Sequence, residues 1–498
     1  MKHAHARFSL IVFAAVVLLF LTQCNKEQFA DSSDQKVAFS ADTVLFDTVF
    51  TTIGSTTLPL KVYNPHNDPI VVSSIDVMGG ADSPFRIAVD GLNGTGFQDL
   101  EIGPNDSAWV FVEVTIDPNG ATSALIEEDS VRFVTNGNTE YVHLVAWGQD
   151  ACFHGGLGAL TVLECDEVWN ADKPHVIYGI VAVDEGCSLT INPGTQVHCH
   201  NASGLYVFKG SLDVQGELGN EVCFQGDRLE PEYADVPGQW GIQLQVQFET
   251  GFGVEQATIN RGGIWLFETQ DCEIDHAIIK NGIIGIQCDT TGTSTGESLR
   301  INNTVVTNMS AIGLYTQGAH VSGSNCLFSN CGQNCAAFSI GGKYDFHHTT
   351  FANYWTQSNR QSPAFYINNY YVDVDQNVQV RPLLEANFTN CIMYGNNAEL
   401  SDFNEFEYDF SLDAEQPNYF FNDCYVDTDQ DILDGSHFSN MSQGQGEPPF
   451  VEPFAGNFDF PGPVASAFRS QTGFINTTTD IEGVFRSGLF ARGCYMDD

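Results

Sequence analysis

The heptapeptide NNTVVTN, residues 302–308, decides the fold because close variants of it return along the chain as NCLFSN, HTTFAN, NCIMYG and DCYVDT. When the variants are aligned, a column of small residues holds Ala277, Thr304, Cys326, Thr349, Cys391 and Cys424. Two places later, a column of large apolar residues holds Ile279, Val306, Phe328, Phe351, Met393 and Val426. Two places further on, an asparagine-rich column holds Asn281, Asn308, Asn330, Asn353, Gly395 and Thr428.

The spacing of these columns predicts a solenoid. Members of the first column follow one another at intervals of 27, 22, 23, 42 and 33 residues, so a basic unit near 22 residues is lengthened by insertions. In a parallel β-helix, successive coils stack at about 4.8 Å, and equivalent positions form ladders. The first two columns then face the interior. The asparagines mark a bend where the backbone turns left-handed and side chains bond from coil to coil.

The composition and net charge of the chain limit the kinds of molecule that it can bind. The chain has 498 residues, of which 43% are hydrophobic and 16% charged, as in a globular protein. It carries 19 Lys and Arg against 63 Asp and Glu, a formal charge of −44. A surface this acidic repels phosphates, which excludes nucleic acid as a partner. It suits a salty external medium, a divalent cation such as Ca²⁺, or plain solubility.

The N-terminus predicts secretion and a lipid anchor. Lys2 and Arg7 precede an apolar run from Phe8 to Leu21, which has the pattern of a secretory signal and is too short to span a bilayer. The following LTQC, ending at Cys24, resembles the lipobox of bacterial lipoproteins, whose cysteine is acylated. The resemblance implies a signal peptide at 1–24, a tether at 25–36, and attachment to the outer membrane facing the cell exterior. The alternative is an ordinary signal peptide with an incidental cysteine.

Residues 37–150 are expected to form a β-sandwich. Short alternating runs rich in Val, Ile, Phe and Thr are separated by Gly, Pro, Asn and Asp. The runs are TVLFDTVF, LPLKVYN, PIVVSSIDVM, SPFRIAV, AWVFVEVTI, DSVRFVT and EYVHLVAWG. They resemble the immunoglobulin-like domains related to the major sperm protein. Such domains bind partners or act as spacers.

Residues 151–498 resemble the right-handed parallel β-helix repeat family, which has the pectate-lyase-like architecture. The whole chain is therefore predicted to be all-β. The combination of lipobox, sandwich and β-helix resembles a class of Gram-negative surface lipoproteins. The final ~45 residues, rich in Phe, Pro and Gly, are expected to cover an exposed solenoid end.

Enzymes of this architecture have recognisable motifs, and the chain lacks those of the known families. The GHG and RIK motifs of polygalacturonases are absent, and DD occurs only as Asp497–Asp498. The arginines of the coil region, Arg261, Arg300, Arg360 and Arg381, stand in no lyase motif. The sequence thus favours a non-catalytic binding or adhesion scaffold for polysaccharide or a surface protein. The alternative is a polysaccharide lyase or glycoside hydrolase with an unrecognised site.

The longest interval contains the candidate ligand-binding residues. Aromatic side chains beside Asn and Arg are typical of sugar-binding surfaces, and this insertion is expected to overhang the coils. The candidates are Tyr354, Trp355, Tyr366, Tyr370 and Tyr371. The alternative, which the sequence favours, is that the rings cover an edge of the β-helix, as any insertion must.

Calcium is the one cofactor that the sequence suggests. Asp427, Asp429 and Asp431 stand at alternate positions, a spacing that lets several oxygens converge on Ca²⁺ at about 2.3–2.6 Å. A similar fragment holds Asp373 and Asp375 before Asn377. For both segments the sequence leaves open, and favours, a simple polar turn.

The cysteines are expected to be mostly structural. Without Cys24, 13 of the 14 cysteines remain, so at least one is unpaired. Cys326, Cys391 and Cys424 share the column of Ala and Thr, which predicts small buried side chains rather than metal ligands.

Overall fold

The computed structural model describes residues 29–51, 54–117, 125–250, 253–291, 296–373, 375–397, 403–410, 416–433, 435–443, 447–473, 476–487 and 490–496. The chain divides into two compact units, residues 1–150 and 151–498. Cys24, the expected anchor, lies outside the described residues. In the described part, no helix is long and apolar enough to cross a membrane.

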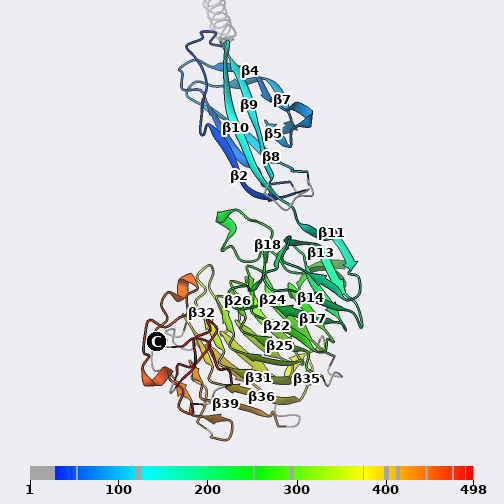
Figure 1. Ribbon diagram of the computed structural model, residues 1–498, viewed down its shortest axis with the longest axis vertical. Coiled ribbons are helices and arrows are strands. Elements are labelled where there is room, and N and C mark those ends of the chain that lie inside the picture. The colour runs from blue at the N-terminus through cyan, green and yellow to red at the C-terminus, as the bar shows by residue number, and fades with distance from the viewer. Residues whose placement is uncertain are drawn as a thin grey trace, which may run out of the picture. The chain divides into compact units, whose positions relative to one another are not determined.

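The first unit is a β-sandwich of two five-stranded sheets (Figure 1). The first sheet contains, in spatial order, β1 (Ala38–Phe39), β3 (Leu58–Tyr63), β8 (Ser107–Val114), β5 (Phe85–Val89) and β6 (Leu92–Gly94). The second contains β2 (Thr43–Phe50), β10 (Asn138–Gln149), β9 (Leu125–Thr135), β4 (Ile70–Val77) and β7 (Gly96–Ile102). All seven expected strands are present, and β1, β6 and β7 are additional.

The alternation of buried and exposed side chains along each strand explains why these segments form a sandwich. In β8, Val110, Val112 and Val114 are fully buried, whereas the alternating Trp109 and Phe111 are about half exposed. Strand residues two apart share a face, so one side of each sheet enters the core and the other meets solvent.

The second unit is a parallel β-helix built from three ladders, which follow one another along the chain in each coil (Figure 1). Ladder A consists of β16 (Gly204–Phe208), β21 (Ile264–Phe267), β24 (Ile284–Asp289), β27 (Ile312–Gln317), β30 (Ala336–Ser339), β33 (Phe365–Asn368) and β38 (Phe406–Asp409). Ladder B consists of β12 (Glu167–Trp169), β14 (Ser188–Ile191), β17 (Ser211–Gln215), β22 (Cys272–Asp275), β25 (Leu299–Asn302), β28 (His320–Ser324), β31 (Gly342–His347), β36 (Leu383–Thr389), β39 (Tyr419–Asn422) and β41 (Phe438–Ser439). Ladder C consists of β15 (Gln196–Cys199), β18 (Val222–Gly226), β23 (Ala277–Lys280), β26 (Val305–Thr307), β29 (Leu327–Ser329), β32 (Thr350–Asn353), β37 (Ile392–Gly395), β40 (Tyr425–Val426) and β42 (Ser442–Gln443).

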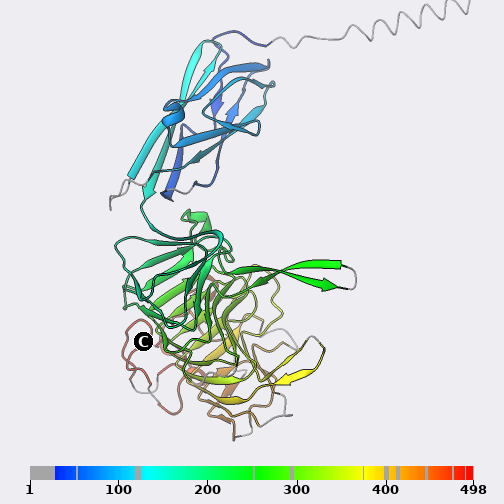
Figure 2. The ribbon, with the colours of Figure 1, turned by 90° about the vertical axis from the view of Figure 1, so that its right-hand side faces the viewer.

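The first coils and the insertions complete the unit. β11 (Cys152–Val162) pairs with β13 (His175–Val183), whose first half pairs with β15 of ladder C and whose second half pairs with β16 of ladder A. Two antiparallel hairpins project from the coils (Figure 2): β19 (Gln243–Thr250) with β20 (Gly253–Asn260), and β34 (Tyr370–Val372) with β35 (Val378–Val380). Short 3-10 helices are η1 (Gly80–Asp82), η2 (Pro231–Tyr233), η3 (Pro453–Ala455) and η4 (Ser466–Phe468).

The repeated columns lie in register on ladder C, as predicted. Ile279 pairs in sequence with Val306, Phe328, Phe351, Met393 and Val426. Every member of this column and of the small-residue column is buried. The columns therefore form the inner side of ladder C.

Several coils use left-handed residues at two turns, and only one of these turns was predicted. The prediction holds for the first three members of the asparagine column, whereas Asn353, Gly395 and Thr428 do not have a positive φ. At the turn from ladder C to ladder A, Asn281, Asn308 and Asn330 have φ of 67°, 57° and 52°, and Asn308 Nδ2 donates to Asn281 Oδ1 at 2.7 Å. The turn from ladder B to ladder C has a second column with φ from 45° to 61°. Its members are His276, Asn303, Asn325, His348, Asn390, Asp423 and Asn440.

The C-terminal segment lies along the outer side of ladder C over several coils, rather than only across the end where a cover was expected. Arg486 donates to Asn325 at 2.8 Å, and the amide of Asn476 donates to His348 at 3.2 Å. Buried Arg492 pairs with Asp423 at 2.9 Å. The physical reason is that outward residues of this ladder are apolar, including Leu327, Ile392 and Tyr425, which this segment buries.

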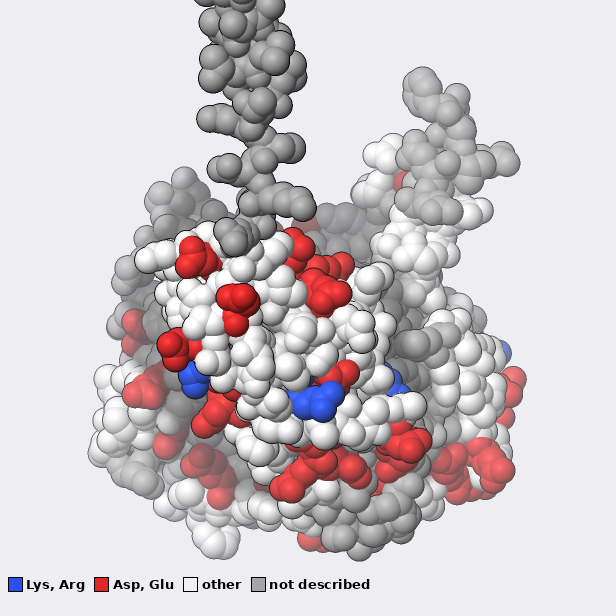
Figure 3. Space-filling model, turned by 90° about the horizontal axis from the view of Figure 1, so that it is seen from above, with Lys and Arg blue, Asp and Glu red and all other residues white. Residues whose placement is uncertain are grey.

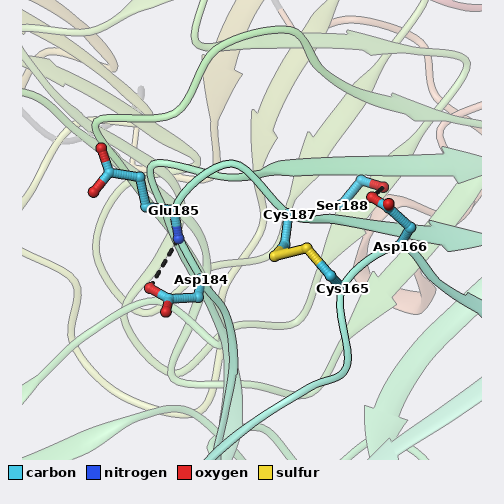
Figure 4. The surroundings of a disulfide bond; sticks show 6 residues. All are labelled: Cys165, Asp166, Asp184, Glu185, Cys187 and Ser188. Carbon is cyan, nitrogen blue, oxygen red and sulfur yellow. Dashed lines mark hydrogen bonds between the residues drawn. A yellow bond between two sulfur atoms is a disulfide. The ribbon is translucent and has the colours of Figure 1, made fainter.

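The cysteines behave largely as expected. Among the described residues, one disulfide joins Cys165 to Cys187 across 22 positions, next to the start of β14 (Figure 4). The eleven other described cysteines are free. Cys326, Cys391 and Cys424 are buried in the core of the coils.

Candidate functional site

The outward side of ladder A carries a strip of mostly aromatic and polar side chains, here called face A. Its first column holds Tyr206, Trp265, Gln287, Tyr315, Ala337, Tyr366 and Glu407. Its second column holds Phe208, Phe267, Asp289, Gln317, Ser339, Asn368 and Asp409. The alternate residues of the same strands, such as Leu266, Cys288 and Phe338, fill the core.

The end of face A nearest the first coils is aromatic. The rings of Tyr206 and Trp265 lie 4.5 Å apart, and those of Phe208 and Phe267 stack at 6.0 Å with an interplanar angle of 11°. These rings are partly exposed. They provide apolar surface that runs from coil to coil.

Asp289 is the central polar group of face A. Its Oδ2 accepts hydrogen bonds from Trp265 Nε1 at 2.9 Å and Gln287 Nε2 at 2.7 Å. Its Oδ1 accepts none from any described residue. The side chain is only 7% exposed, and burial raises the pKa of Asp289 to about 6 against the two hydrogen bonds, which lower it.

Arg261 and Tyr315 complete the surroundings of Asp289. The Arg261 guanidinium lies 5.4 Å from the centre of the Trp265 ring, and its charge lowers the pKa of Asp289. Burial, followed by the nearby Asp289 carboxylate, raises the pKa of Tyr315. Gln317 Nε2 donates to the Tyr315 hydroxyl at 2.9 Å. A cation, a carboxyl, a phenol and an indole thus share one patch.

This patch is better equipped for binding than for glycoside hydrolysis by paired carboxyls. Such hydrolysis needs two carboxyl groups about 5–10 Å apart. The residues that flank Asp289 in its column are Phe267 on one coil and Gln317 on the next. Asp409 is four coils further on, about 19 Å at the usual strand spacing.

The structure separates the five predicted aromatic residues into two groups. Tyr366 lies on face A, where its hydroxyl accepts from Asn368 at 3.2 Å. Tyr370 and Tyr371 lie on the adjoining hairpin strand β34. The Tyr370 hydroxyl donates to the Asp409 carboxylate, which raises the pKa of Tyr370 to about 12. Tyr371 is 38% exposed beside the Arg381 guanidinium.

The other two predicted residues lie elsewhere, against ladder C. Tyr354 is 2% exposed and packs edge-on against Phe454 at 5.2 Å. Trp355 is 8% exposed, and its Nε1 donates to Ser358 at 2.9 Å. Both therefore serve as walls under the C-terminal segment and not as exposed platforms.

The structure does not bring the predicted calcium ligands together. In the described ranges, no group of three His, Cys, Asp or Glu is placed to hold a metal ion. Burial, with the nearby Glu405 and Asp429, raises the pKa of Asp427 to about 6. Asp429 and Asp431 are exposed, and Asp431 Oδ1 accepts from the Leu433 amide at 3.0 Å, as in a polar turn.

The second acidic fragment also forms a turn. Asp373 Oδ1 accepts from the amides of Asp375 at 3.0 Å and Asn377 at 2.9 Å, which closes the hairpin between β34 and β35. The backbone of the turn is closed separately, by the amide of Asp373 donating to the carbonyl of Asn377 at 2.9 Å and the amide of Gln376 donating to the carbonyl of Asp373 at 3.0 Å. This geometry is the polar hairpin that the sequence favoured.

The residues of face A, apart from Tyr366, were missed by the sequence analysis. Its members belong to different residue types and are separated by 20 or more positions, so no motif appears in the sequence. The available signal was the ladder register: each outward pair lies between the buried residues of one short strand. The first strands with this pattern are LYVF and IWLF.

The comparisons with known proteins find distant resemblances in structure and assign no activity to this chain. A scan against protein-family models finds no match, and a search of curated proteins finds none. Among solved structures, XylC in complex with xylose is 8% identical, covering 90% of this chain and 88% of its own, with a TM-score of 0.34. The catalytic unit of a GH87 alpha-1,3-glucanase from Streptomyces thermodiastaticus is 10% identical over 74% of this chain and 79% of its own, with a TM-score of 0.26. A PapD-like domain of human CEP192 is 10% identical, covering 25% of this chain and 91% of its own, with a TM-score of 0.17.

Proposed function

We propose that the β-helix binds an extended, uncharged polysaccharide along face A without cleaving it. The observation that carries this proposal is the ladder of aromatic and polar side chains on one outward face, in which Ala337 of β30 is a small apolar member. From β16 to β38 this ladder spans six coil steps, about 29 Å at a strand spacing of about 4.8 Å. A surface of that length suits a chain of sugars better than a single small molecule.

The chemistry of face A matches the two sides of a sugar ring. Aromatic rings such as Trp265 pack against the ring's C–H groups, while the partly or fully exposed side chains of Gln317, Glu407 and Asp409 take its hydroxyls. The chain has 63 Asp and Glu against 19 Lys and Arg, and acidic side chains outnumber basic ones on the end of the molecule drawn in Figure 3. A polyanion would be repelled by this charge, so an uncharged chain is favoured.

The test compares Trp265→Ala with Trp109→Ala in residues 25–498. Trp109 is a matched control because it is exposed on a sheet of the other unit. Affinity electrophoresis would use soluble xylan, mixed-linkage glucan and dextran, with polygalacturonate as the anionic comparison. We expect at least one uncharged glycan to bind and Trp265→Ala to weaken it about tenfold, or 1.4 kcal/mol.

The proposal fails if Trp265→Ala and Trp109→Ala behave alike, or if only polygalacturonate binds. Reducing ends would be assayed in the same samples. If reducing ends are released, the function is hydrolysis of the glycan and not binding alone.

Catalysis at Asp289 is the second candidate. The observation in its favour is the raised pKa of about 6, which keeps part of the carboxyl protonated near neutral pH, as a general acid requires. If this candidate is right, Asp289→Asn abolishes the release of reducing ends or of unsaturated products while binding persists. If products are absent from the parent protein, the candidate is rejected.

We further propose that the protein is an outer-membrane surface lipoprotein anchored through Cys24, related to β-helix lipoproteins of the pectate-lyase-like architecture. The support is the signal-like run before LTQC. Metabolic labelling with palmitate should mark the parent protein and not Cys24→Ser. Protease added to whole cells should then remove the labelled parent protein, and protection from it would place the anchor on the inner side of the membrane.

A further inference from the structure

A groove on ladder C forms a second concave site. Its volume is about 310 Å³, at the small end of the range for ligand pockets. Three successive coils provide its floor. Lys280, Thr307 and Ser329 are in register there, beside the outward side chains of Val305 and Leu327.

The asparagine column borders this groove and fixes its walls. Asn281 Nδ2 donates to the carbonyl of Ala234 at 2.7 Å, and Asn308 Nδ2 donates to the carbonyl of Asp235 at 2.9 Å. Asn308 also bonds Asn281, so the loop and two coils form one network. The loop that carries Asp235 is thereby held against the edge of the floor.

The opposite walls are fixed by the third asparagine. Asn330 Oδ1 accepts from the amide of Tyr354 at 3.1 Å, and its Nδ2 donates to the carbonyl of Pro453 at 3.4 Å. The groove is thus lined by segments around residues 235, 355 and 455, which are far apart in sequence. Phe454, 64% exposed, adds an open aromatic face to this wall.

The electrostatics of the groove differ from those of the whole chain. Lys280 is the one Lys or Arg among the described lining residues, and Asp235 is the one carboxylate. Lys280 forms no ion pair with another described residue. An ammonium with no ion pair in the described part of the chain, next to the hydroxyl of Thr307 in a chain of net charge −44, favours a small ligand with one negative charge.

We propose that this groove binds an acidic saccharide of one or two units, with the carboxylate of a uronic acid paired to Lys280. The sugar's hydroxyls bond to Thr307 and the carboxylate of Asp235, and its apolar side packs on Phe454, while the buried Ser329 hydroxyl donates to Thr307 at 2.8 Å and holds it in place. A single ammonium suits a carboxylate, whereas a phosphate group is more often held by arginine forks. The site is separate from face A and does not depend on the function proposed for it.

The experiment is calorimetric titration of residues 25–498 with galacturonic acid and its dimer. Galactose and its dimer are the uncharged comparisons. We expect the acidic dimer to bind at least about tenfold more tightly than the uncharged one, and Lys280→Gln to lose about tenfold in affinity. Lys280→Arg retains the charge and should lose less.

Lys343→Gln is the matched control. Lys343 lies on ladder B, is similarly half-exposed, and pairs with Glu385 at 3.0 Å, so its loss should leave the affinity unchanged. Equal affinity for acidic and uncharged sugars, or equal behaviour of Lys280→Gln and Lys343→Gln, would overturn the proposal. So would the absence of heat with every sugar tested.

A second variant tests the role of the walls. Asn308→Gly keeps a residue that accepts positive φ but removes the side chain that holds Asp235. We expect it to weaken binding of the acidic dimer while the far-ultraviolet circular dichroism is unchanged. Unchanged binding would show that the asparagines have no part in the site.

Discussion

Asp289 has a carboxyl group that the folded chain solvates poorly. Its pKa rises from 3.8 to about 6, so between these values the folded state binds more protons than the unfolded state. Stability therefore falls as the pH rises through that window, by about 3 kcal/mol in total, and stays lower above it.

Asp289→Asn should remove this dependence. We expect the variant to be more stable than the parent by about 1–3 kcal/mol near neutral pH, with no gain below about pH 4. Thermal unfolding at both pH values measures the difference, and Asp172→Asn, at an exposed carboxyl, is the control. An equal gain at both pH values would contradict the burial of the charge.

Two substitutions of Asn308 can separate the contributions of its backbone conformation and of its side-chain hydrogen bonds to stability. Its φ of 57° strains most residues, and its side chain bonds Asn281 and Asp235. Asn308→Gly loses the bonds alone, whereas Asn308→Ala also strains the backbone. Chemical unfolding should show the Ala variant less stable than the Gly variant by about 1 kcal/mol. Equal stabilities would mean that the left-handed turn relaxes.

At the scale of single residues, the sequence predicted those positions of a coil that accept only one type of residue. The inward columns of ladder C were predictable because small and apolar residues are required there. The column of His276, Asn303, Asn325 and Asp423 was not, because the common requirement is a positive φ and several polar residues meet it. Each of these residues directly precedes a member of the small-residue column, and this fixed position was the signal that the sequence analysis missed.

Among the elements, the C-terminal segment is held by a buried ion pair. Arg492 and Asp423 both have fully buried side chains, and Asp423 also accepts from Ser470 and Thr472. Removing Arg492 leaves a buried carboxylate without its cation.

Arg492→Met should destabilise the fold by about 3–5 kcal/mol and expose residues 447–496 to limited proteolysis. Arg300→Met is the matched control, because Arg300 is 51% exposed and its pair with Glu297 is worth at most about 1 kcal/mol. Denaturant unfolding compares the two. If both variants lose the same stability, the ion pair does not hold the segment.

The strands of the first unit were predictable because each is a continuous alternating run. Face A was not, since each coil contributes only one or two outward residues. Their neighbours are set by strand register, which pairs Asp289 with Gln317 across 28 positions. Tyr354 and Tyr366 are close in sequence but face different sides of the coil, because the corner between ladder C and ladder A lies between them.

At the scale of the whole molecule, the two units have separate cores. Val112 and Phe133 belong to the core of the sandwich, and Ile279 and Phe388 to that of the coils, and among the described residues the two cores have no member in common. Residues 29–150 alone, which include the segment around Ala30 and Gln35 that bonds to the sandwich, should therefore unfold cooperatively, with the midpoint that this unit has in the longer chain. Circular dichroism of both proteins would show it. A fragment without a transition would contradict independent folding.

The central claim is that face A holds an uncharged glycan, and the most direct measurement is the affinity of Trp265→Ala for the soluble glycan that the parent chain binds. The claim predicts a loss of about tenfold, with Trp109→Ala unchanged and no reducing ends released. Equal binding by both variants would contradict it.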